Sequence, residues 1–298
     1  MRNWIRIVAF MGIFLTNTLA AEEDFYKAVP VTPINSFTSG IEGPACDREG
    51  KLFVVNFERQ GTIGRVGLYG NAEVHLSLPE NGVGNAIRFG RDGTMFIADY
   101  INHRILKVAP ASTEITVHVD EPLMHQPNDL TITTDGTIYA SDPDWEHGAG
   151  RIWRISVDGR CEIVAKDLKL PNGIEIAPDG RHLYVALTEA AEVIVFDVDQ
   201  SGQLSNQKSF VRFSENLVDG IRCDITGNLY VARYGAAAVA IVSVDGERVR
   251  DVNVLGNEPS NLCFGGADGR TVFVTEVQNR RVVKFTVPQP GATWASHQ

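Results

Sequence analysis

The stretch NDLTITTDGTIYASD, residues 128–142, contains the pattern that decides the fold. A short apolar run ends in an Asp-led turn at Gly136, and a second run rich in β-branched and aromatic residues follows. This order is typical of a β-hairpin, because Asp-Gly pairs favour a tight reversal between two strands. Similar glycine turns before a β-rich run recur along the chain, at Gly50, Gly93, Gly136, Gly180, Gly227 and Gly269.

The spacing of these turn glycines is nearly constant, with intervals of 43, 43, 44, 47 and 42 residues. Several units continue into a third apolar strand, at 104–108, 151–155, 192–196 and 281–285. No stretch shows sustained helical periodicity. A period of about 40–50 residues with several strands per unit is typical of a β-propeller. We therefore predict an all-β fold, a six-bladed β-propeller with four-stranded blades.

The sixth unit ends too early to form a complete blade. After the strand at 281–285 the chain continues only as a tail that contains Pro and Gly. Residues 25–37 precede the first unit and belong to no unit of their own. We predict that this N-terminal segment supplies the missing outer strand and closes the ring, because closure removes exposed sheet edges.

The first residues have the layout of a secretory signal peptide. Arg2 and Arg6 precede an apolar run at 7–15, and small residues follow at 18–20. The run is shorter than the roughly 20 residues that a transmembrane helix needs. We predict that residues 1–20 are a signal peptide, that 21–298 form a single propeller domain, and that the protein is periplasmic or secreted. An uncleaved N-terminal anchor is the alternative.

The chain has 27 Lys and Arg against 37 Asp and Glu, a formal net charge of −10. This acidity argues against nucleic acid and against an anionic membrane surface as partners. The four cysteines, Cys46, Cys161, Cys223 and Cys263, lack the spacing of a metal site. Cys46, Cys223 and Cys263 lie in short apolar runs, so we expect buried thiols at these three positions. The sequence does not determine whether any of the cysteines form disulfides, and it does not determine the oligomeric state.

One position in each repeat carries an oxygen-bearing side chain. It lies eight residues before the turn glycine, at Glu42, Asn85, Asn128, Asn172, Asp219 and Asn261. The same offset in six blades predicts one ring of side chains at one mouth of the central channel. Turn capping by Asn and Asp is the alternative, although the side chain of Glu42 is too long for that role. Two carboxylates at one channel repel unless protons or a cation lie between them. An all-oxygen set suits a hard cation, Ca²⁺ before Mg²⁺.

Four motifs together resemble the gluconolactonase/regucalcin (senescence marker protein) family of six-bladed propellers. They are IEGP at 41–44, PNDL at 127–130 with DGTIYASD at 135–142, PNGI at 171–174 with PDGRHLYV at 178–185, and VDGI at 218–221 with GNLYVA at 227–232. The resemblance covers nearly all of the chain after the predicted signal peptide. It implies one divalent metal at the top of the channel.

The resemblance also implies roles for single residues. Glu42, Asn172 and Asp219 match metal ligands of the family, and Asn128 matches a residue beside the metal that touches substrate. Asp219 also matches the usual candidate for the general base. The chain departs from the mammalian sugar-lactonase members at Gln126, where those members carry a substrate-binding Arg.

The resulting hypothesis is a metal-dependent hydrolase of small lactones. Asp219 would accept a proton from the attacking water, while Asn128 and Asn85 orient the ester. His125, near the mouth of the channel, is a secondary candidate for proton transfer. We expect one divalent cation, Ca²⁺ first, with Zn²⁺, Mg²⁺ and Mn²⁺ left open. The expected partner is a small-molecule substrate, with no nucleic acid and no membrane after signal cleavage.

Two other function classes stay open. One is a phosphotriester or aryl-ester hydrolase that uses the same metal site, because loops at the mouth set specificity. The other is a non-enzymatic propeller that binds a partner, since a fold does not determine a function. Signatures of serine hydrolases, P-loop proteins and zinc proteases are absent from the sequence. We expect the charged residues of the loops after each second strand, such as Asp99, Asp142 and Glu276, to form a mostly solvated rim.

Overall fold

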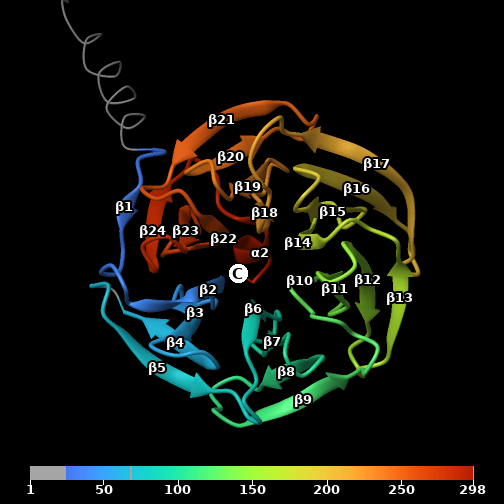
Figure 1. The fold of residues 1–298 in the computed structure, drawn as a ribbon, viewed down its shortest axis with the longest axis horizontal. Coiled ribbons are helices and arrows are strands. Elements are labelled where there is room, and N and C mark those ends of the chain that lie inside the picture. Colours follow the sequence, from blue (N-terminus) through green and yellow to red (C-terminus); the bar gives the residue numbers. More distant parts are fainter. Residues whose placement is uncertain (1–24, 68, 298) are drawn as a thin grey trace, which may run out of the picture.

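A computed structural model describes residues 25–67 and 69–297. The predicted signal peptide, 1–20, lies outside these residues. Six four-stranded antiparallel sheets stand around a central channel, as predicted from the repeat (Figure 1). In the described part of the chain, no helix is long and apolar enough to cross a membrane.

The first three blades follow one another along the chain, each with its innermost strand first. Blade 1 contains β2 (Phe37–Cys46), β3 (Leu52–Phe57), β4 (Thr62–Val66) and β5 (Ala72–Ser77). Blade 2 contains β6 (Gly84–Phe89), β7 (Met95–Asp99), β8 (Arg104–Val108) and β9 (Ile115–Asp120). Blade 3 contains β10 (Leu130–Ile132), β11 (Ile138–Asp144), β12 (Ala149–Ile155) and β13 (Cys161–Ala165).

The remaining blades continue in the same order around the ring. Blade 4 contains β14 (Pro171–Ile176), β15 (His182–Leu187), β16 (Glu192–Val198) and β17 (Leu204–Arg212). Blade 5 contains β18 (Ile221–Cys223), β19 (Leu229–Arg233), β20 (Ala238–Val242) and β21 (Arg248–Asn253). Blade 6 contains β22 (Pro259–Gly265), β23 (Thr271–Glu276), β24 (Arg281–Thr286) and β1 (Val29–Pro30).

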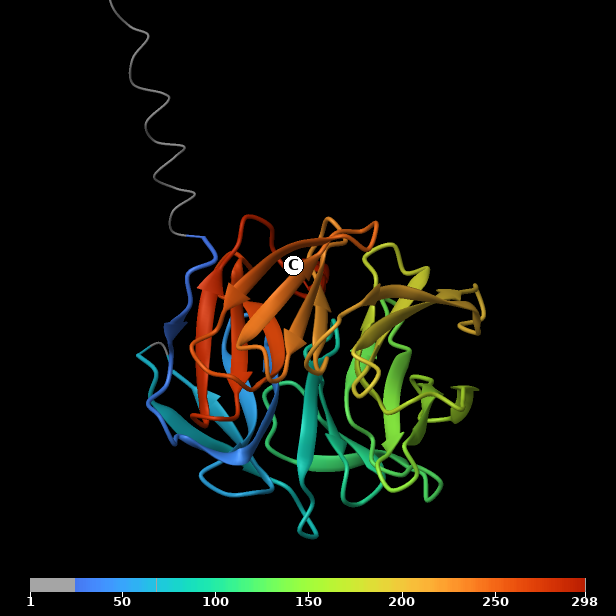
Figure 2. The ribbon, with the colours of Figure 1, turned by 45° about the horizontal axis from the view of Figure 1, so that its top comes forward.

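The N-terminal segment closes the ring, as predicted. β1 pairs antiparallel with β24, with Val29 opposite Lys284 and Pro30 opposite Val283. The outer strand of the last blade therefore comes from the start of the chain, at the rim of the ring in both views (Figure 2). This arrangement leaves β24 paired on both sides.

The repeat has a direct physical basis in the turns between the first two strands of each blade. All six turn glycines have positive φ, from +67° at Gly180 to +88° at Gly136. Residues with a Cβ adopt this conformation at a cost, so glycine recurs there. The apolar faces of the strands form six clusters, and each cluster lies between two neighbouring blades.

Within residues 25–67 and 69–297, the tail after blade 6 forms an element that the sequence did not predict. Helix α2 (Ala292–Ser296) lies at the centre of the ring in Figure 1. A side chain on Gly269 would collide with the Trp294 ring, so the helix packs tightly against the turn of blade 6. α2 thereby covers the end of the channel where the turn glycines lie.

Candidate active site

The six oxygen-bearing residues of the repeat come together where the inner strands begin. They interact in three neighbouring pairs. Asn261 Nδ2 donates to Glu42 Oε2 at 3.0 Å, across the boundary of blades 6 and 1. Asn85 Nδ2 donates to the backbone carbonyl of Asn128 at 3.3 Å, and the Asn172 side chain lies close enough to the Asp219 carboxyl to lower its pKa. The three pairs span all six blades and form one polar layer, which we call the ring layer.

A cavity of about 190 Å³ opens at this layer. Glu42, Asn85 and Asp219 line it, and Tyr100 and Tyr234 contribute to its walls. Asn128, Asn172 and Asn261 are more deeply buried, with 8%, 5% and 1% of their surface exposed. The ring layer therefore presents two carboxyls and one amide to a small molecule, with three amides behind them.

Two buried oxygen atoms of the ring layer lack a hydrogen-bond partner. Among the described residues, no protein group donates to Oδ1 of Asn128 or to Oδ1 of Asp219. A buried acceptor without a partner costs about 1–3 kcal/mol. The sequence analysis expects Asp219 to bind a metal and Asn128 to lie beside it.

The carboxyls of the ring layer are hard to ionise without a counter-charge. Burial raises the pKa of Glu42 to about 7, although Gly43 N and Asn261 Nδ2 donate to this carboxyl. Burial raises the pKa of Asp219 well above its usual range, and the charges of Glu42 and Asp129 raise it further. A cation between the two groups would reverse this effect by favouring both ionised forms.

A second polar layer lies deeper in the channel. Arg88 and Arg222 both donate to the carboxylate of Asp129, which is fully buried. Arg222 Nη2 also donates to Asn261 Oδ1 at 3.2 Å, and so connects the second layer to Glu42. Glu175 accepts hydrogen bonds from Cys223 N and Thr131 Oγ1, and burial raises its pKa to about 8.

The channel contains more carboxyls than guanidiniums. Its two polar layers hold Glu42, Asp129, Glu175 and Asp219 against Arg88 and Arg222. Fully ionised, these groups leave two negative charges without a partner, which equals the charge of one divalent cation. Within the described residues no three His, Cys, Asp or Glu side chains converge, so Asn oxygens must complete the set. Carboxylate and amide oxygens are the donors that hard cations prefer.

The family model described as "SMP-30/Gluconolactonase/LRE-like region" matches residues 40–278 of the chain. The chain belongs to this family. The match covers the inner strands of blades 2 to 6, all of β2 except its first three residues, and every residue of the ring layer.

Named relatives of this gluconolactonase-like chain include two hydrolases. A gluconolactonase from Zymomonas mobilis is 29% identical over 65% of this chain and 61% of its own length. A diisopropyl-fluorophosphatase from Loligo vulgaris is 27% identical over 85% of this chain and 91% of its own length. Among solved structures, a calcium-binding regucalcin from Agrobacterium tumefaciens has a TM-score of 0.74 at 22% identity, over 88% of this chain and 97% of its own.

His125 lies beside the site rather than in the cavity. It is absent from the cavity lining, and its Nε2 accepts a hydrogen bond from the Arg151 guanidinium. The backbone N–H groups of His125 and Gln126 donate to Asp142 Oδ1 at 2.8 and 2.7 Å. A role for His125 with substrate stays a prediction.

The expectation of a solvated rim was wrong for several charged residues. Asp99, Asp142 and Glu276 are fully buried at the ends of the second strands. Each accepts backbone N–H groups of a nearby loop, as Asp99 does from Val83 and Glu276 from Gln278 and Asn279. These carboxylates therefore hold the loops at the mouth, which sequence polarity alone did not reveal.

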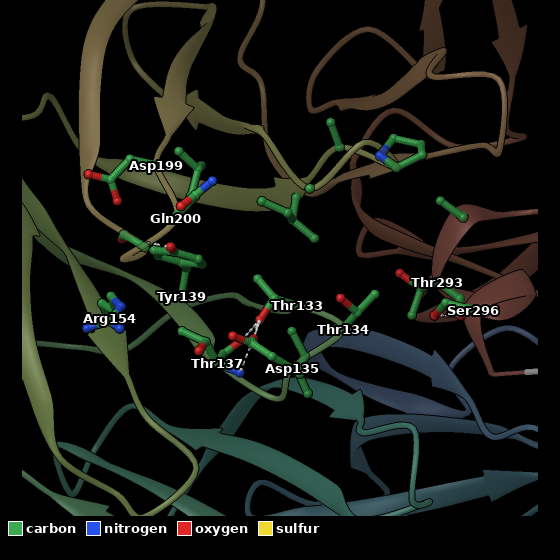
Figure 3. Close-up of a pocket in the computed structure, with 18 of the residues that line it drawn as sticks. Thr133, Thr134, Asp135, Thr137, Tyr139, Arg154, Asp199, Gln200, Thr293 and Ser296 are labelled. Carbon is green, nitrogen blue, oxygen red and sulfur yellow. Dashed lines mark hydrogen bonds between the residues drawn. The ribbon is translucent and has the colours of Figure 1, made fainter.

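A larger cavity of about 440 Å³ lies at the opposite end of the channel (Figure 3). The turn at Thr133–Thr137, the loop at Asp199–Gly202, and Thr293 and Ser296 of α2 surround it. It contains no residue of the ring layer. Its size therefore does not identify it as the site of this family's chemistry.

The sequence analysis missed Arg88, Glu175 and Arg222 of the second layer. A signal for them exists in the repeat, because each lies five residues before its turn glycine. The remaining blades carry Ala45, Thr131 and Phe264 at this offset. Because the six residues at this offset include charged, polar and apolar types, the offset does not show as a repeated motif in the sequence.

Proposed function

We propose that the protein is a metal-dependent hydrolase of small lactones. The observation that carries the proposal is the ring layer, with two buried carboxyls of raised pKa and with amide and carboxyl oxygens that lack a hydrogen-bond partner. Family membership and the gluconolactonase relative support the lactone as substrate class.

One divalent cation, with Ca²⁺ as first choice, is part of this proposal. Glu42, Asp219, Asn172 and Asn128 would hold it, because these residues supply the two carboxylates and the buried oxygens of the ring layer. When bound, such a cation supplies Lewis-acid polarisation of the ester carbonyl. The calcium-binding regucalcin among the structural neighbours supports this choice of metal.

The chain's own residues supply the remaining steps. The cavity admits a small cyclic ester, and Asn85 offers an amide N–H or oxygen at its wall to orient it. Asp219 lines the same cavity and accepts the proton of the attacking water. Tyr100 and Tyr234 line the same cavity, whose volume of about 190 Å³ suits a small molecule.

The test combines metal analysis with turnover on one preparation. Metal-loaded, chelated and reconstituted protein is assayed on gluconolactone, aliphatic lactones and a fluorophosphate, with Ca²⁺, Mg²⁺, Mn²⁺ and Zn²⁺ compared. We expect lactone hydrolysis that chelation abolishes and one metal restores. Glu58→Gln, which removes an exposed carboxylate outside the ring layer, serves as the control and should behave as the parent. Chelated protein as fast as the loaded form would contradict the mechanism.

The diisopropyl-fluorophosphatase relative, aligned over 91% of its length, supports a second candidate activity on phosphorus esters. Faster turnover of the fluorophosphate than of any lactone would favour it. Metal-dependent thermal stability without turnover on the whole panel would instead favour a binding protein.

Export from the cytoplasm is a further part of the proposal. It rests on the basic start, short apolar run and small residues within 1–20. N-terminal sequencing of protein recovered from the periplasm or medium should find a start near Ala21.

A further inference from the structure

Two cysteines meet at the seam where the ring closes. Cys46 ends β2 in blade 1, and Cys263 lies in β22 of blade 6. Their Sγ atoms are 3.9 Å apart, although 217 residues separate them in the sequence. The other two cysteines, Cys161 and Cys223, lie in blades 3 and 5. The first and last blades therefore bring one pair of thiols into contact.

The seam is closely packed around this pair. A Cβ on Gly265 would lie 2.2 Å from Cys46 Sγ, so the backbone of β22 rests directly on the sulfur of the other blade. Cys263 belongs to the apolar cluster that joins blades 1 and 6, and Cys46 packs against this cluster. The strand that closes the ring, β1, pairs with β24 through two residues, and backbone hydrogen bonds from Tyr26, Val31 and Asn35 continue the contact with blade 6. Non-covalent contacts alone hold this boundary when the thiols are reduced.

We propose that Cys46 and Cys263 form a disulfide that joins blade 1 to blade 6 when the protein folds in an oxidising environment. The oxidant is a small or protein-borne disulfide. One cysteine thiolate attacks a sulfur of the oxidant, whose S–S bond breaks and releases one thiol. The second thiolate then attacks the cysteine sulfur of the mixed disulfide and releases the second thiol. The two cysteines are oxidised, the oxidant is reduced, and the two protons end on the released thiols.

The surroundings of the pair determine when this bond can form. Both cysteines border a cavity of only about 40 Å³, which Trp294 and His297 of the C-terminal tail also line. No disulfide oxidant fits such a space. The hydrogen bond to Cys263 and burial raise the pKa of the Cys46 thiol well above its usual range, so the folded thiol reacts slowly. The bond therefore forms during folding, before α2 covers the channel.

The experiment compares two refolding conditions. The chain is unfolded with reductant and refolded in a glutathione redox buffer or in reductant alone. Thiols are then counted in denaturant, and peptides are mapped without reduction. We expect two free thiols and a Cys46–Cys263 peptide after oxidative refolding, and four free thiols after reductive refolding. Because the bridge closes a loop of over 200 residues, the oxidised form should melt roughly 5–10 °C higher.

Three variants define the outcome. Cys46→Ser and Cys263→Ser should each lose the bridge and the difference in melting temperature, while the matched control Cys161→Ser should keep both. Oxidant added to the folded, reduced protein should form the bridge much more slowly than oxidative refolding. Four free thiols after oxidative refolding, or a bridge between other cysteines, would overturn the proposal. A bridge that leaves the melting temperature unchanged would overturn its role in holding the seam.

Discussion

The two ends of the channel differ, although the same inner strands build both. At the mouth, Glu42 and Asp219 face a cavity with no Arg or Lys in its lining. Deeper in the channel, Arg88 and Arg222 hold the carboxylate of Asp129, and α2 covers the end. The deeper layer supplies its own counter-charges, and the ring layer does not.

Under the proposed function, this difference separates a layer that is structural from a layer that would bind a cation. The Asp129 carboxylate receives hydrogen bonds from two guanidiniums within the protein, although burial still raises its pKa. Buried carboxyls with raised pKa values and unpartnered oxygens are satisfied only by protons or by an added cation. The following predictions test this contrast, from the largest expected effect to the smallest.

The first prediction compares the two carboxylates of the ring layer. Asp219→Asn and Glu42→Gln each keep an oxygen and remove one negative charge, so each should weaken cation binding. At saturating metal, Glu42→Gln should recover much of its turnover number. Asp219→Asn should stay about 10²–10⁴-fold slower, because an amide cannot act as general base. Lactone turnover against metal concentration measures both. Equal recovery would leave Asp219 as a ligand only and make His125 the next candidate base.

The second prediction concerns Glu175, the deeper carboxyl that no guanidinium contacts directly in the described hydrogen bonds. Its pKa rises from 4.5 to about 8 on burial, so the folded protein keeps a proton that the unfolded chain loses. Stability should therefore fall as pH rises through this window. Glu175→Gln should gain about 2–4 kcal/mol relative to the parent between pH 5 and pH 9.

Denaturant unfolding of the metal-free proteins at both pH values measures this effect. The exposed Glu247→Gln is the matched control and should show no such gain. A parallel pH dependence of the parent and Glu175→Gln would show that Glu175 keeps an ordinary pKa in the fold.

The third prediction asks whether the two layers communicate. Arg222 contacts both Asp129 and Asn261, whereas Arg88 contacts Asp129 but not Asn261. Arg222→Met should remove one of the two donors to the Asn261 amide oxygen, the other being Leu262 N, and weaken calcium binding about 10–100-fold. Arg88→Met should have a clearly smaller effect. Calorimetric calcium titrations of both variants measure these affinities. An equal loss of calcium affinity in the two variants would mean that the positive charge near Asp129 matters rather than the hydrogen bond to Asn261.

The fourth prediction concerns the covered end of the channel. Trp294 of α2 packs against the turn of blade 6 and the apolar cluster of blades 5 and 6. Trp294→Ala should cost about 1–2 kcal/mol of stability, less than a fully buried Trp, because the ring is partly exposed. Calcium affinity should stay the same. Thermal melts and calcium titrations, with Thr293→Ala as control, measure both. A changed affinity would show that the two ends are coupled.

Local spacing made much of the fold predictable. The turn glycines, the third strands and the closing N-terminal segment were all predicted correctly, because each depends on a hairpin or on a pattern within one repeat. The ring layer also followed from one repeated offset. The short helix α2 was missed, since five residues give too little periodicity to detect.

The sequence by itself determined six blades, their order and the one position per blade that carries an oxygen to the mouth. Only the tertiary structure decided how the charges pair. Arg88 and Arg222 both contact Asp129, although they are separated from it by 41 and 93 positions in the sequence. It also decided that Asp99, Asp142 and Glu276 are buried and that Cys46 meets Cys263. A repeat fixes what each blade contributes, whereas contacts between blades depend on which side chains face each other after the ring has closed.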